Sequence, residues 1–61
     1  MYISNYQIKS LTQRLKNLLG YVPKEAWVIN LAIEIEISPK HFFSDGQLVQ
    51  HYREIERLHN H

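Results

Sequence analysis

Four histidines and six carboxylates are the side chains of this 61-residue sequence that could ligate a metal or carry a proton. Glu56 and His59 stand three residues apart, which places two ligands side by side on one helix face. His51 and Glu54 repeat the spacing in reverse order, but the remaining acids and His41 show no such pairing. A His/Glu metal site at a dimer seam is therefore our third-ranked hypothesis, and we expect no resident metal or cofactor.

His41, Ser44 and Asp45 could in principle form a hydrolytic trio. Ser44 and Gln47 have the spacing of a capping box, however, so we interpret this segment as the start of a helix. The two glycines are isolated, and neither a nucleophile elbow nor a phosphate-binding glycine loop is present in the sequence. The sequence therefore predicts a protein that is not an enzyme.

The chain contains no cysteine, which excludes a disulfide scaffold and a thiolate zinc site. A domain of this length buries only about 60% of the surface that its unfolded chain exposes. No stretch approaches the roughly 18 apolar residues of a membrane span, and the N-terminal residues lack a signal-peptide pattern. We therefore expect one soluble cytoplasmic domain over residues 1–61, supported by helix packing, an oligomer or a partner.

Apolar spacing predicts a first helix over residues 4–19. Its apolar residues recur three and four positions apart: Ile8, Leu11, Leu15, Leu18 and Val22. Gly20 stands where a left-handed C-cap would end the helix, and Lys16 lies in the last turn, where a cation complements the helix dipole.

A second helix is expected to begin at Pro23, placed in its first turn, with Glu25 near the positive end of the helix dipole. Nine of the twelve residues from Ala26 to Ile37 are apolar, and no single helix face holds them all. The strict alternation over residues 33–37 also suits a strand; we prefer a helix because the chain offers no second strand to pair with it. A central helix this apolar predicts a homodimer.

The remaining residues predict a short helical turn and a third helix. Ser38 and Pro39 have the types of an N-cap and a first helical residue, which predicts a turn over residues 40–43. The capping box at Ser44 opens a helix to about His59. Its inner stripe comprises Leu48, Tyr52, Ile55 and His59. The predicted fold class is thus all-α, a small three-helix domain with a short helical turn before the last helix.

The net charge of +1 conceals a division along the chain. Residues 1–24 carry four cations and no acid, whereas residues 25–61 carry six acids and three cations, so that +4 and −3 sum to +1. Such asymmetry is typical of a charged partner or of head-to-tail association, although two halves of one domain can also attract each other.

Residues 31–43 resemble the helix-turn-helix of bacterial and phage transcription regulators. Ala32 matches the small residue at which the two helices cross, apolar Leu31, Ile35 and Ile37 flank it, and a Ser-Pro pair often starts the recognition helix. The resemblance implies that Lys40, His41 and Ser44 lie near the DNA groove. Glu36 departs from the family, which usually has glycine at this position, and Asp45 with Gly46 shortens the second helix.

Two functions remain open, both of them regulatory and based on binding a macromolecule. The leading hypothesis is a DNA-binding regulator that uses six polar residues: Lys40, His41, Ser44, Arg53, Arg14 and Lys16. The alternative is a protein-binding inhibitor or adaptor that docks on a larger partner through exposed aromatic and aliphatic residues. Its interface candidates, shared with the homodimer, are Trp27, Ile29, Ile33, Phe43, Tyr6 and Tyr21.

Overall fold

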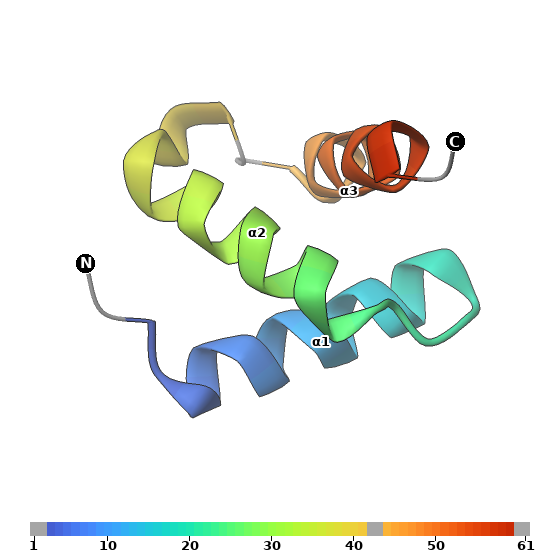
Figure 1. The fold of residues 1–61 in the computed structure, drawn as a ribbon, viewed down its shortest axis with the longest axis horizontal. Coiled ribbons are helices and arrows are strands. Elements are labelled where there is room, and N and C mark those ends of the chain that lie inside the picture. The colour runs from blue at the N-terminus through green and yellow to red at the C-terminus, as the bar shows by residue number, and fades with distance from the viewer. Residues whose placement is uncertain (1–2, 42–43, 60–61) are drawn as a thin grey trace.

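The computed structural model describes residues 3–41 and 44–59, with His41 described by its backbone alone. Over these ranges the chain forms α1 (Asn5–Leu19), α2 (Glu25–Ile37), the 3₁₀ turn η1 (Pro39–His41) and α3 (Asp45–His59), with no strand. Figure 1 shows α2 crossing α1 obliquely, with α3 viewed nearly end on beside α2. The all-α class, the three helices and the short turn before the last are confirmed, and the strand alternative for residues 33–37 is wrong.

Local signals fix both ends of α1. The Ser4 hydroxyl accepts a hydrogen bond from the Gln7 backbone N–H at 3.1 Å, and the Gln7 side-chain carbonyl accepts one from the Ser4 N–H at 2.8 Å. Gly20 ends the helix with φ of 83°, and its N–H donates to the Lys16 carbonyl at 2.9 Å. The predicted left-handed cap is confirmed, and glycine suits it because a Cβ would strain this backbone.

The core lies where the three helices meet. It comprises Leu15, Val28, Leu31, Leu48, Tyr52 and Ile55. Leu18 and Val22, predicted to face inward, are exposed, and Leu19 packs against the core instead. At 3.6 residues per turn, Leu19 is turned about 40° from the buried Leu15 and Leu18 about 60° in the opposite sense, so the packing of α2 and α3 rather than the helical period separates them.

The α1–α2 connection is held by a buried tyrosine. Tyr52 of α3 is fully buried, and its hydroxyl accepts a hydrogen bond from the Lys24 backbone N–H at 2.9 Å. Burial is the main cause that raises the pKa of this phenol. Lys24 is the N-cap of α2, so the helix begins at Glu25, and Pro23 lies before it as a buried loop residue rather than in its first turn.

Candidate functional site

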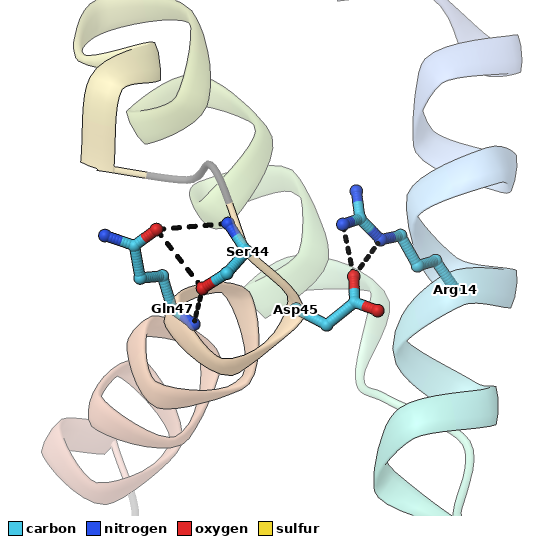
Figure 2. A network of polar contacts seen from close by, with 4 residues as sticks. All are labelled: Arg14, Ser44, Asp45 and Gln47. Atoms are coloured by element: carbon cyan, nitrogen blue, oxygen red, sulfur yellow. Dashed lines mark hydrogen bonds and ion pairs between the residues drawn. The ribbon is translucent and has the colours of Figure 1, made fainter.

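Ser44 and Gln47 form the predicted capping box at the start of α3 (Figure 2). The Ser44 hydroxyl accepts a hydrogen bond from the Gln47 N–H at 3.2 Å, and the Gln47 side-chain carbonyl accepts one from the Ser44 N–H at 3.1 Å. The Ser44 hydroxyl also donates to the Gln47 side-chain carbonyl at 3.3 Å. The hydroxyl that a hydrolytic trio or a base contact would use is therefore engaged in holding the helix start.

Arg14 and Asp45 join α1 to the same end of α3. The Arg14 Nε donates to an Asp45 carboxylate oxygen at 2.9 Å, and the Nη2 of the same guanidinium pairs with that oxygen (Figure 2). Both side chains are about half exposed, so the pair adds little to stability. The Arg14–Asp45 pair instead affects the charge of this surface, because the Asp45 carboxylate offsets the positive charge with which Arg14 would contact a DNA phosphate.

The other cations predicted to contact DNA lie on separate elements. Lys16 is in the last turn of α1, Lys40 is in η1 and Arg53 is in the middle of α3, and all three are exposed. The side chain of His41 lies outside the described part of the structure. Within that part, the structure brings together only Arg14 and Ser44, and it does so through Asp45, the residue next to Ser44.

Part of the predicted helix-turn-helix corner is buried as the resemblance implies. Leu31 and Ala32 are buried and Ile35 is half-buried. Ile37, expected to help seal the corner, is instead 65% exposed, because the last turn of α2 directs it away from the core. The segment that corresponds to the start of the recognition helix forms the single turn η1, which the structure describes as far as His41.

Trp27 lies at the edge of the core rather than on an open surface. Its ring is half-buried, with centroids 6.2 Å from Tyr52 and 6.1 Å from His59. The ammonium of Lys24 lies 5.0 Å from the Trp27 ring centroid, a cation–π contact. His59 Nδ1 lies 2.8 Å from the carbonyl oxygen of Ile55. This interface candidate is thus largely occupied by contacts within the chain.

The tyrosine interface candidates differ in exposure. Tyr6 is 79% exposed and Tyr21 is 44% exposed. The Tyr21 hydroxyl donates a hydrogen bond to a Glu56 carboxylate oxygen at 3.1 Å. Burial and this hydrogen bond raise the pKa of Tyr21. Phe43 lies outside the described residues. Glu56 and His59 both contact other groups of the chain, and the described residues include no cluster of three or more possible metal ligands.

The outer face of α2 carries an apolar row that α1 and α3 cover only in part. We define the α2 stripe as the apolar residues of this face, which also carries the half-buried Asn30: Ala26, Ile29, Ile33 and Ile37. Ala26 is exposed, Ile29 is half-buried, and Ile33 and Ile37 are 38% and 65% exposed. The opposite face supplies Val28 and Leu31 to the core, so α2 is apolar on both sides.

Carboxylates flank the α2 stripe. Glu25, Glu34 and Glu36 are the charged residues of α2, which carries no Lys or Arg. The Gln7 side-chain amide of α1 donates to Glu36 at 3.2 Å and so holds this carboxylate at the α1–α2 boundary. The stripe is therefore an apolar surface with an acidic rim.

Two depressions lie beside α1. The first, of about 220 Å³, lies between α1 and the C-terminal half of α2. Its apolar lining is Ile3, Leu11, Ala32 and Ile35, and its charged lining residues are Arg14 and Glu36. The second, of about 560 Å³, lies along the other side of α1, where Lys9 and Glu25 give it mixed charge. The first adjoins the α2 stripe at Glu36, which lines the depression and lies three residues after Ile33.

The apolar excess of α2 predicted Ile29 and Ile33 as interface residues, whereas no pattern in the sequence placed Glu36 between the stripe and the depression. In the described part of the chain, no helix combines the length and apolar content that crossing a membrane requires. Comparisons with protein-family models, curated proteins and solved structures find no match to this chain. Its function therefore has to be argued from its own surface.

Proposed function

We propose that this protein is a non-enzymatic regulatory module that binds another protein through the α2 stripe. The observation that carries the proposal is the exposure of Ile33 and Ile37, one turn apart on a helix whose opposite face already forms the core. Exposed apolar rows with a polar rim are typical of surfaces that bind other proteins.

The exposed isoleucines of the stripe leave apolar surface that a partner could still bury. Fully burying an isoleucine side chain is worth about 1.5–3 kcal/mol relative to leaving it exposed. Ile37, at 65% exposure, retains most of that gain for a partner, and Ile33, at 38%, retains part of it. Ile29 and Ala26 extend the row along the same face. A helix laid along this face is one of the recurring modes of peptide recognition.

DNA binding stays the second candidate, because one observation favours it. α1 carries no acid, and Lys9 and Lys16 are exposed on it. We rank it below protein binding because Asp45 offsets Arg14 and Ser44 caps α3. Phosphate contacts dominate nucleic-acid affinity, and an affinity carried by so few cations would be weak.

Capture from an extract of the source cells tests the proposal. The wild-type protein, the double variant Ile33→Ser/Ile37→Ser and the control Leu58→Ser serve as baits; Leu58 is exposed on α3, away from the stripe. We expect one protein to be enriched by the wild type and the control and lost with the double variant. Equal enrichment by all three baits, or enrichment of nucleic acid in place of protein, would overturn the proposal.

The homodimer stays a prediction that concerns the same surface, with the second copy as an alternative occupant of the stripe. We retain the cytoplasm as the proposed location. Mass measurement by light scattering tests the dimer independently of any other partner. A dimer that Ile33→Ser/Ile37→Ser dissociates would identify the second copy as the occupant.

A further inference from the structure

Glu36 lies between two apolar features of the surface, and this inference rests on the function proposed above. On α2, Ile33 is three residues and Ala32 four residues from Glu36, so all three are neighbours on the helix surface. Ile33 belongs to the α2 stripe, and Ala32 lines the 220 Å³ depression. A partner that places one apolar side chain in each feature must bring a polar group to Glu36.

The charge of the rim indicates the sign of that group. Three carboxylates and no cation belong to α2. Two neighbouring cations have partners within the chain: Lys24, at the N-cap of α2, lies over the Trp27 ring, and Arg14, which lines the depression, pairs with Asp45. A partner with Lys or Arg beside its apolar residues would pair with this rim, whereas an acidic partner would be repelled.

The same rim disfavours a second copy as the occupant. Packing two α2 stripes against each other would gather the three carboxylates of both copies along one seam, and neither helix brings a cation to offset them. Like charges brought together at an interface oppose association. The exposed cations of α1 do not resolve this, because Lys9 and Lys16 lie on a helix face without an apolar row to match the stripe.

The dimensions of the stripe indicate a short partner segment. α2 has 13 residues and is therefore about 20 Å long, with a width of about 10 Å. This footprint is well below the roughly 800 Å² per partner that stable globular complexes bury. A surface of this size suits a single helix of about 14 residues, bound reversibly.

We infer that the α2 stripe and the adjoining depression bind a short basic amphipathic helix of a partner protein. Apolar residues of that helix cover Ile33 and Ile37 and enter the depression. A Lys or Arg between them pairs with Glu36, and further cations face Glu25 and Glu34.

Peptide titration followed by NMR tests the inference. The probe is a synthetic 14-residue Leu/Lys peptide with a helical apolar stripe, and its counterpart has Glu at every Lys position. We expect the Leu/Lys peptide to shift the amide signals of α2 and to bind at least 10-fold more tightly than the Leu/Glu peptide. Glu36→Gln should weaken binding about 2- to 5-fold, as expected for one exposed ion pair. Gln keeps an acceptor for Gln7, so the variant retains the hydrogen bond that positions the side chain.

The control is Glu54→Gln, which makes the same charge change on α3, and it should leave the affinity unchanged. Equal binding of the two peptides would overturn the basic partner while leaving the protein-binding function in place, because that function is judged by the capture experiment. Three other outcomes would also overturn the inference. They are equal weakening of peptide binding by Glu36→Gln and Glu54→Gln, amide signal shifts confined to α1 or α3, and no binding of either peptide. A peptide-free dimer lost on Ile33→Ser/Ile37→Ser would assign the surface to a second copy instead.

Discussion

Replacing Tyr52 by Phe should destabilise the domain although it removes only one oxygen atom. The Tyr52 hydroxyl accepts the Lys24 N–H at 2.9 Å from within the core and so fixes the connection before α2. In Tyr52→Phe the Lys24 N–H loses its protein acceptor and faces a phenyl ring instead, which should lower the free energy of unfolding by about 1–2 kcal/mol. A domain of this size has about 3–5 kcal/mol of stability, so the loss is a large share of it.

Urea and thermal unfolding followed by circular dichroism measure this effect. For a domain of this length, each kcal/mol lowers Tm by about 4–8 °C. The matched control is Tyr6→Phe, since Tyr6 is 79% exposed and its hydroxyl has no hydrogen-bond partner among the described residues. We expect Tyr6→Phe to unfold at the same urea midpoint and the same Tm as the wild type. If Tyr52→Phe also unfolds at the wild-type midpoint, the Lys24 contact does not hold the connection and the reasoning is wrong.

Three further outcomes are expected. Folding raises the pKa values of Tyr21 and Tyr52, so both contribute stability that is complete below the ordinary tyrosine value of about 10 and is lost as the pH rises through their folded pKa values. Tyr21→Phe should therefore lose less stability at alkaline pH than the wild type does. An identical loss of stability in the two proteins would count against this. Ser44→Ala should cost about 1 kcal/mol by removing the α3 cap, and an unchanged urea midpoint would contradict it. Arg14→Gln should cost at most about 1 kcal/mol, a difference that about 1 M NaCl removes; a larger, salt-independent loss would mean that the pair with Asp45 is not its source.

The end of α1 and the start of α3 were predictable because their signals are local, whereas the start of α2, which has no side-chain cap, was misplaced at Pro23. Gly20 and the Ser44–Gln47 box each act through residues within four positions, so spacing alone identified them. The Ser4–Gln7 box carries the same spacing and could have been found in the same way. Leu18 and Leu19 are adjacent and equally apolar, so the sequence does not say which one faces inward; that depends on how α2 and α3 pack against α1.

Contacts between distant residues were not predictable. Arg14 pairs with Asp45 across 31 positions, and Gln7 reaches Glu36 across 29. The apolar excess of α2 led to the choice of Ile33 as an interface residue; the residue is 38% exposed, and its role in an interface stays a prediction. The sequence alone could not predict which face of α2 stays exposed or that Glu36 lies at its edge, because both depend on how all three helices pack.

Site-specific photocrosslinking tests the central claim, that the α2 stripe is the docking surface, most directly. A photoreactive phenylalanine analogue replaces Ile37 in one protein and Asn17, exposed on α1, in the other, and both are irradiated in extract of the source cells. We expect one protein to crosslink from position 37 and not from position 17. Crosslinks from position 17 alone, or to nucleic acid from either position, would contradict it.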